Sequence, residues 1–276
     1  MALTNVQLTV WSRIFNSALR AELNAITALT RADIVNATIE KGKTVKVQRL
    51  ADIATIDYDP TGNTFADLTD TEIEIAFDQD KITPFKVQNT DSFFSNKDLM
   101  IEAAKNMAFS LRDGIDKYIY TQYPAQASVV IDDGASGYLT VNSTNILEFV
   151  GKILTAMNVA NVPMGMRTVT IPSWMDPLIR NLEIANKDSA GMGQGFVADV
   201  YGIKFYMSNN IVETTGNYDM VGGYDGAFQF AIAYSKLWAG DLGILGIDGN
   251  GAWEHAVYGG KAVKPEAMIH MKVKAA

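Results

Sequence analysis

Two histidines are the only imidazole side chains in the chain, and neither lies in a pattern typical of catalysis. His255 and His270 have no Gly-x-Ser-x-Gly nucleophile motif beside them, and the sequence has no His-x-x-x-His pair. Glu266 and His270 are four residues apart, but that spacing shares a face only on a helix, and their segment alternates like a strand. The absence of cysteine excludes disulfides, thiolate metal sites and cysteine nucleophiles. We therefore expect both histidines to be structural.

Three other segments resemble binding motifs without completing them. Residues 57–68 begin like a calcium loop, but Leu68 occupies the twelfth position, where a bidentate glutamate is required. Residues 189–195 contain three glycines, yet they follow an expected helix and precede an expected strand, the reverse of a phosphate-binding loop. The adjacent carboxylates Asp132 and Asp133 lie in a turn-rich stretch. We therefore predict no catalytic, cofactor-binding or metal site, and we interpret the chain as a non-enzymatic protein.

Composition indicates a folded chain whose partners are not recognised through a basic surface. Of the 276 residues, 48% are hydrophobic, which excludes an intrinsically disordered chain. The net charge is −8, and lysine and arginine form no runs, which argues against binding nucleic acid by neutralising phosphates. No uninterrupted apolar stretch is long enough for a transmembrane helix, and the N-terminus lacks a secretory pattern. We expect no membrane partner.

Apolar periodicity predicts one long helix in the middle of the chain. Residues 96–122 place apolar side chains, including Met107 and Leu111, on one face over about six turns. Pro124 is expected to end this helix, because proline lacks the N–H that an inner turn requires. Further helices are predicted over 5–30, near 145–158 and from about 173 to 186.

Two alternating segments predict a charged β-hairpin. Residues 43–49 and 71–78 each place apolar side chains on one face, and their polar faces carry opposite charges. Antiparallel pairing would align these charges favourably. Between the two strands, residues 50–70 are polar and rich in turn formers, so the tip buries little apolar surface of its own. We therefore expect the hairpin to contact a neighbouring subunit, through Lys43, Lys46, Arg49, Glu72, Glu74 and Asp78.

Short strands follow in the second half of the chain, between the predicted helices. They are predicted at 167–171, 203–207, 228–234 and 267–274. Alternating helices and strands without a compositional break favour one α+β body that carries a projecting hairpin.

The order of these elements resembles that of the major capsid (coat) proteins of tailed bacteriophages, which have the Hong-Kong-97-type capsid fold. Four stretches carry the resemblance. They are Thr4-Asn5 with Val10-Trp-Ser12, Gly42-Lys-Thr-Val-Lys-Val47, Phe77-Asp-Gln-Asp-Lys81 with Phe85-Lys-Val87 and Asp91, and Asp199-Val-Tyr-Gly-Ile-Lys-Phe-Tyr-Met-Ser-Asn209. The resemblance spans nearly the whole chain, and it depends on the order of these stretches.

The resemblance implies a domain division and an assembled state. The expected units are an N-arm at 1–40, an extended hairpin (E-loop) at 41–93, a peripheral domain at 94–140 and 250–276 that holds a spine helix and a closing strand, and an axial domain at 141–249. Subunits would form pentamers and hexamers of an icosahedral shell around double-stranded DNA, without sequence-specific contact. The protein would belong to the virion after assembly in the host cytoplasm, with scaffolding, portal and decoration proteins as further partners. The Lys–Asn cross-linking motif of some family members has no match here.

Two alternatives remain open at the level of sequence. An encapsulin-type nanocompartment shell protein has the same fold but would enclose a cargo enzyme, and the neighbouring genes would distinguish it from a phage protein. A monomeric enzyme of another fold is disfavoured by the scarcity of histidine and the lack of cysteine.

Overall fold

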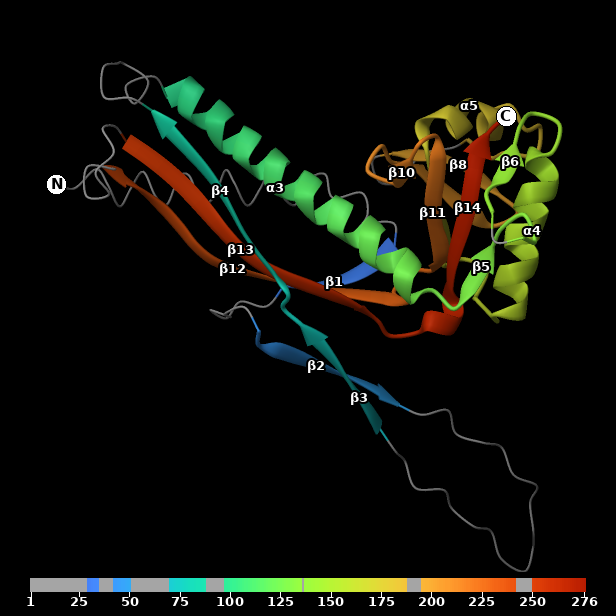
Figure 1. Cartoon of the computed structure of the whole chain (residues 1–276), viewed down its shortest axis with the longest axis horizontal. Coiled ribbons are helices and arrows are strands. Elements are labelled where there is room, and N and C mark those ends of the chain that lie inside the picture. The colour runs from blue at the N-terminus through green and yellow to red at the C-terminus, as the bar shows by residue number, and fades with distance from the viewer. Residues whose placement is uncertain are drawn as a thin grey trace, which may run out of the picture.

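In a computed structural model of the chain, the described residues form three β-sheets and one long helix (Figure 1). The structure describes residues 29–34, 42–50, 70–87, 97–135, 137–187, 195–241 and 250–276. The helices are α3 (Lys97–Gln126), α4 (Ile146–Val159) and α5 (Asp176–Arg180). The strands are β1 (Thr30–Ile34), β2 (Thr44–Leu50), β3 (Asp70–Ala76), β4 (Gln79–Val87), β5 (Val129–Ile131), β6 (Leu139–Val141), β7 (Arg167–Ile171), β8 (Phe196–Val200), β9 (Ile203–Met207), β10 (Val212–Thr214), β11 (Asn217–Tyr224), β12 (Phe228–Asp241), β13 (Asn250–Ala262) and β14 (Met268–Ala275).

A long, narrow sheet forms one side of the molecule, in the order β1-β12-β13-β4. α3 runs along one face of this sheet, and the β2–β3 hairpin lies on the other (Figure 1). Alternation along the strands explains the two faces: Phe230 and Tyr258 belong to the main core under the helix, whereas Ala231 and Val257 belong to a smaller cluster under the hairpin. The sheet therefore lies between a helix and a hairpin, with apolar side chains on both faces.

The long helix is confirmed, but it ends later than the sequence predicts. α3 continues through Pro124 to Gln126, so the expectation that Pro124 ends it is wrong. Contacts with the sheets stabilise its last turns: Tyr120 and Tyr123 are fully buried, and the Tyr123 hydroxyl donates a hydrogen bond to the Gly222 carbonyl at 3.0 Å. Such tertiary contacts outweigh the one backbone bond that proline removes. The 30-residue helix is about 45 Å long.

A compact unit at the other end of the molecule is built on the eight-stranded sheet, in the order β5-β14-β11-β7-β9-β8 with β6 and β10 at its margins. Every residue of β7 is buried. The predicted strands at 167–171, 203–207 and 267–274 and the predicted helix near 145–158 are all present.

The third predicted helix, from 173 to 186, is much shorter in the structure. A 3-10 turn at Ser173–Met175 is followed by α5, which ends at Arg180. The chain leaves the helix because Asn186 forms a bridge with Asp199, with two backbone hydrogen bonds of 2.8 Å. Pairing with the sheet therefore replaces the last turns of the predicted helix.

Strands from both sides of the expected boundaries at residues 141 and 250 share sheets. β14, expected in the peripheral unit, pairs with β11 in the eight-stranded sheet, and its Ile269 and Met271 side chains are fully buried there. β12, expected in the axial unit, pairs along its length with β13 in the narrow sheet. The physical reason is that β12 and β13 are consecutive antiparallel strands that complete each other's hydrogen bonds.

Three predictions fall on parts of the chain outside the described residues. They concern nearly all of the N-terminal helix over 5–30, the calcium-like stretch 57–68 and most of the glycine-rich stretch 189–195. At the end of the first of these, Thr30 already belongs to β1. Among the described helices, none is long and apolar enough to span a membrane.

Candidate assembly surface

The two-stranded β2–β3 hairpin projects from the narrow sheet (Figure 1). β2 and β3 pair antiparallel, as predicted, and Lys46 lies directly opposite Glu74. The Lys46 Nζ lies 2.5 Å from a Glu72 carboxylate oxygen and 4.0 Å from one of Glu74. The hydrogen bond that Lys46 donates to the Glu72 carboxylate, and the negative charge of that carboxylate, raise the pKa of Lys46. All three side chains remain about half exposed, so dissolved salt screens their attraction.

The other three predicted contact residues lie in different surroundings. The Lys43 carbonyl accepts a hydrogen bond from the Phe77 N–H at 3.0 Å, at the base of the hairpin. The backbone of Arg49 pairs with Thr71, and its side chain lies outside the described part of the structure. Asp78 points to α3, as described below. The structure thus brings together Lys46, Glu72 and Glu74 but not the whole predicted set.

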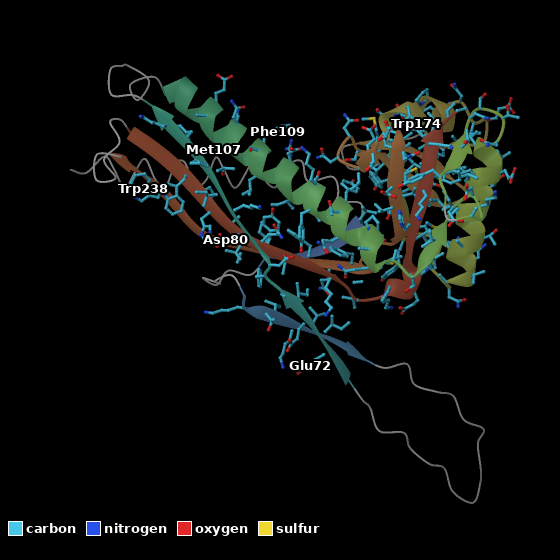
Figure 2. All side chains as sticks on the ribbon, in the orientation of Figure 1. Glu72, Asp80, Met107, Phe109, Trp174 and Trp238 are labelled. Carbon is cyan, nitrogen blue, oxygen red and sulfur yellow. The ribbon has the colours of Figure 1, made fainter. Side chains whose placement is uncertain are left out.

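The base of the hairpin is anchored on the narrow sheet by a small apolar cluster. Ile75 and Phe77 of the hairpin are buried against Ala231 and Ala233 of β12 and Val257 of β13. The sheet residues in this cluster are small, so the hairpin backbone can approach closely. Figure 2 shows the resulting arrangement, with Glu72 on the hairpin and Asp80 on β4 of the narrow sheet.

One glycine makes this close crossing possible. A Cβ atom on Gly259 would lie 1.9 Å from the Ala76 carbonyl oxygen and 3.2 Å from the Phe77 Cα. No L side chain fits there without displacing the hairpin backbone. Sequence reasoning missed this position, although a Gly-Gly pair inside a strand is a known signal of close backbone approach.

A hydrogen-bonded tyrosine connects the hairpin base to both the helix and the sheet. The Tyr118 hydroxyl of α3 donates to the Asp78 carboxylate at 2.9 Å and accepts from the Gly260 N–H at 3.2 Å. Burial, followed by the bond to Asp78, raises the pKa of Tyr118 well above its usual range, so the hydroxyl stays protonated and donates. Tyr118 also packs edge-on against Tyr258, with ring centroids 5.3 Å apart. Asp78 is therefore occupied within its own subunit.

Both histidines pair with carboxylates of neighbouring strands. The His255 Nε2 of β13 contacts Asp80 of β4. The His270 Nε2 of β14 lies 2.8 Å from the Asp219 carboxylate of β11, which also accepts a hydrogen bond from the Tyr138 hydroxyl at 3.3 Å. Each pair joins two strands of one sheet, in keeping with a structural role. Within the described ranges, no three or more histidine, aspartate or glutamate side chains gather in a group that could hold a metal ion.

One carboxyl group is buried beneath the long helix. Glu254 of β13 is 5% exposed and lies between Ala252 and Ala256 on the face that packs against α3. The opposing residue on β4 is Thr83. Burial raises the pKa of Glu254 to about 7.

Because Glu254 is buried, we expect the free energy of unfolding to fall as the pH rises. In the unfolded chain Glu254 loses its proton near its ordinary pKa of 4.5, whereas the folded chain retains it to about 7. The unfolded state therefore binds fewer protons between these values, and the free energy of unfolding decreases across that window, by up to about 3 kcal/mol. The variant Glu254→Gln should match the parent at pH 4 and melt at a higher temperature at pH 8. Equal melting temperatures at pH 8 would show that the carboxylate is solvated.

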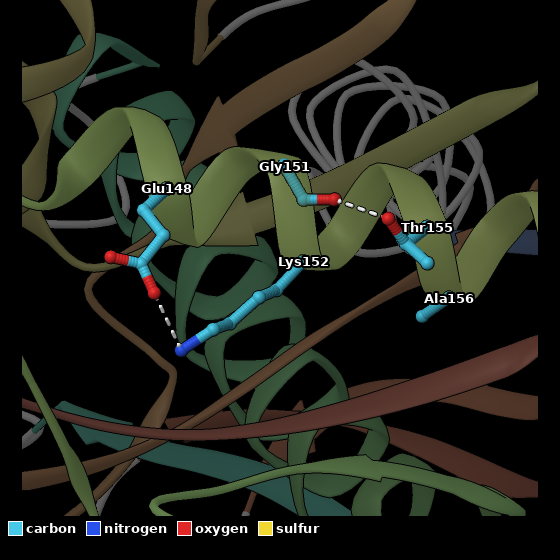
Figure 3. Close-up of a pocket in the computed structure, with 5 residues that line it drawn as sticks. All are labelled: Glu148, Gly151, Lys152, Thr155 and Ala156. Atoms are coloured by element: carbon cyan, nitrogen blue, oxygen red, sulfur yellow. Dashed lines mark hydrogen bonds and ion pairs between the residues drawn. The ribbon is translucent and has the colours of Figure 1, made fainter.

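Two shallow grooves are the notable depressions of the described surface, and neither has the features of an active site. One, of about 570 Å³, lies on α4 (Figure 3). Its polar groups are paired within the helix: Lys152 with Glu148 at 3.1 Å, and the Thr155 hydroxyl with the Gly151 carbonyl at 2.9 Å. The other, of about 480 Å³, lies between α3 and β4 and is lined partly by Lys81.

The overall arrangement is shared with solved capsid structures. The chain superposes on a structure of Mycobacterium phage Che8 with a TM-score of 0.60 and 20% identity, over 84% of this chain and 85% of that one. It superposes on the capsid of Ralstonia phage GP4 with a TM-score of 0.67 and 11% identity, over 93% and 92%. A virus-like particle from Pyrococcus furiosus gives a TM-score of 0.57 and 12% identity, over 98% and 100%. No protein-family model and no curated protein sequence matches the chain. The chain therefore has the α+β fold of tailed-phage capsid proteins, as its order of elements predicted.

Proposed function

We propose that the chain is the major capsid protein of a tailed bacteriophage. Copies of it assemble into pentamers and hexamers, which close an icosahedral shell around double-stranded DNA. The observation that carries the proposal is the hairpin: among its described residues, the apolar side chains that pack on the subunit are Ile75 and Phe77, with Val45 and Val47 against them, while Lys46, Glu72 and Glu74 stay about half exposed on a hairpin that projects from the narrow sheet (Figure 1). In a shell, neighbouring subunits would lie along this hairpin and contact it. The fold shared with phage capsids supports the same conclusion.

The proposed domain division follows the sheets. α3 and the narrow sheet form the peripheral unit, with α3 as the spine helix, and the eight-stranded sheet with α4 and α5 forms the axial unit around the capsomer symmetry axes. The β2–β3 hairpin is the E-loop, and residues 1–40 apart from β1 are the N-arm. Compared with the expected units, this division assigns β5, β6 and β14 to the axial unit and β1, β4 and β12 to the peripheral one.

The role is structural, and the DNA is enclosed rather than bound by sequence. A net charge of −8 argues against a subunit that condenses DNA through a basic surface, so we expect packaging to depend on confinement inside the shell. Portal, scaffolding and decoration proteins are the further partners of such a shell, and the virion is its location.

A second candidate is an encapsulin-type shell that encloses a cargo enzyme. Similarity to the Pyrococcus furiosus virus-like particle over nearly the full length of both chains favours it, although that TM-score is lower than those of the phage capsids. Particles purified from the native source distinguish the two functions. Nuclease-resistant double-stranded DNA inside them supports the capsid, and a co-purifying enzyme without DNA supports the encapsulin.

Self-association of the purified protein tests whether it forms a shell at all, as both the capsid and the encapsulin proposals require. Analytical ultracentrifugation should detect closed particles many times heavier than the 30.1 kDa subunit. A species that stays monomeric over a wide range of concentration and salt would contradict the proposal.

The hairpin assignment predicts protection from proteases on assembly. Its polar tip, about 50–70, cannot alone offset a backbone entropy of about 1–2 kcal/mol per ordered residue. Trypsin should therefore cut near Arg49 in free subunits and much less in shells. High salt, which screens the Lys46 and Glu74 charges, should reduce the protection. Equal cleavage in both states would mean that the hairpin makes no intersubunit contact.

A further inference from the structure

The buried carboxyl of Glu254 lies beneath the long helix, opposite a second polar side chain. Glu254 of β13 is 5% exposed, and Thr83 of β4 opposes it. The Thr83 hydroxyl is buried without a hydrogen-bond partner. Among the described residues, nothing forms a hydrogen bond or ion pair with the Glu254 carboxyl, and a buried carboxylate without such partners is costly. The site therefore suits the protonated, neutral form of Glu254.

A groove beside these two residues gives water a short route to the carboxyl. The groove, of about 480 Å³, lies between α3 and β4, and Thr83, Leu111 and Gly114 are among the residues that line it. A Cβ atom built on Gly114 would meet nothing within 4 Å, so there is open space beside the helix at this position. A small movement of α3 away from β4 would therefore bring water to Thr83 and then to Glu254.

The long helix is held differently on the two sides of Gly114. It contacts β4 and β13 of the narrow sheet and then reaches the eight-stranded sheet (Figure 1). After Gly114, three of its side chains form hydrogen bonds with strands of the two sheets: Tyr118, Tyr123 and Gln126. Before Gly114, Met107 and Leu111 contribute apolar contacts to the core. Because glycine weakens the interior of a helix, the first part of α3 can leave the sheet while the last part stays bound.

The charged groups of the groove do not neutralise a carboxylate while the groove is closed. Its titratable or charged lining side chains are Lys81 of β4, Lys117 and Tyr118 of α3, and Tyr258 of β13. Lys117 is paired with Asp113 at 2.6 Å, and burial raises the pKa of both tyrosines, so they stay neutral. Among the described residues, no carboxylate is paired with Lys81. Lys81 is therefore the cation that a charged Glu254 can meet once the groove opens.

The other elements packed around Glu254 supply no counter-charge on its face of the sheet. On β12, the register places the apolar residue Leu237 opposite it. On the other face, His255 pairs with a carboxylate of β4. The buried Asp116 of α3 lies beside Tyr120 and carries the same sign of charge as a deprotonated Glu254.

We propose that Glu254 is a pH-sensitive latch that holds the first part of α3 against the narrow sheet. While the carboxyl keeps its proton, it stays buried and the helix lies on the sheet. When the proton passes to solvent, the new charge requires water or Lys81 as a partner, so the helix moves away from β4 and the groove opens. Burial raises the pKa of Glu254 to about 7, so the latch acts near neutral pH. Every group of the latch belongs to one chain, and the latch does not depend on the proposed function.

Hydrogen exchange of the free subunit at pH 6 and pH 8 tests the latch. After division by the intrinsic exchange rates, the opening equilibrium of the amides at 105–113 should rise about tenfold between these pH values. The reason is that the closed state loses its proton near 7 and the open state near the ordinary pKa of 4.5, so the open state binds fewer protons and gains as the pH rises. At pH 8 these amides should also open at least about tenfold more often than those of α4, which packs in the other unit.

Two variants separate the latch from a general effect of pH. Glu254→Gln cannot ionise, so its α3 amides should open equally at pH 6 and pH 8. Glu183→Gln removes an exposed carboxyl and should behave like the parent. A tenfold rise that persists in Glu254→Gln, or equal opening of the parent at both pH values, would overturn the latch. Equal opening of α3 and α4 in the parent at pH 8 would overturn it as well, because α3 would then be released only by global unfolding.

Discussion

Replacement of Gly259 by alanine is expected to abolish shell assembly and to lower the free energy of unfolding by about 3 kcal/mol. The added Cβ would lie 1.9 Å from the Ala76 carbonyl oxygen, and this neighbour is backbone, which cannot rotate away as a side chain can. The hairpin base must move off the sheet, and Phe77 must leave its buried position. A displaced base redirects the whole hairpin, so its charged faces no longer meet the neighbouring subunit.

Gly114→Ala is the matched control for this substitution. Gly114 lies within α3, and nothing lies within 4 Å of a Cβ built there. Alanine is favoured over glycine inside a helix by roughly 0.5–1 kcal/mol, so this variant should be slightly more stable and assemble normally. Thermal unfolding and sedimentation of both variants check the prediction. A Gly259→Ala subunit that forms normal shells would show that the hairpin does not depend on this crossing.

Leu111→Asp is expected to remove folded subunits from the soluble fraction. Leu111 is buried in the middle of the apolar stripe of α3, beside Met107 and Ile115. An aspartate there places a charge among apolar side chains, at a cost of about 4 kcal/mol or more. That is a large share of the stability of a typical domain.

The neighbouring residue Ser110 provides the control for Leu111, because it is exposed on the same helix. Ser110→Asp adds the same charge on the solvent side, and it should change the melting temperature little. Circular dichroism and soluble yield measure both variants. If Leu111→Asp assembles with an unchanged melting temperature, the orientation of α3 on the sheet is wrong.

The sequence predicts the elements of this fold well where a periodic pattern is long. The α3 stripe and the β2–β3 alternation are strong signals, and opposite charges on the two hairpin strands correctly predict that these strands pair. The end of α3 is missed because buried tyrosines next to Pro124 hold the helix together. The shortened third helix is missed because Asn186 pairs with a distant strand. Both errors arise from tertiary contacts that a local pattern does not contain.

The candidate assembly surface is predictable in part. The alternation of apolar and charged residues identifies the hairpin. The hydrogen bond between Tyr118 and Asp78 joins residues 40 positions apart, so no local sequence pattern predicts it. The crossing at Gly259 likewise depends on a backbone more than 180 residues away.

Electron cryomicroscopy of particles assembled from the purified chain tests the central claim most directly. The account predicts closed shells with five-fold and six-fold capsomers, in which the eight-stranded units surround each axis and each hairpin lies against a neighbouring subunit. A protein that remains a monomer under all assembly conditions, or particles in which the hairpin contacts no neighbour, would contradict it.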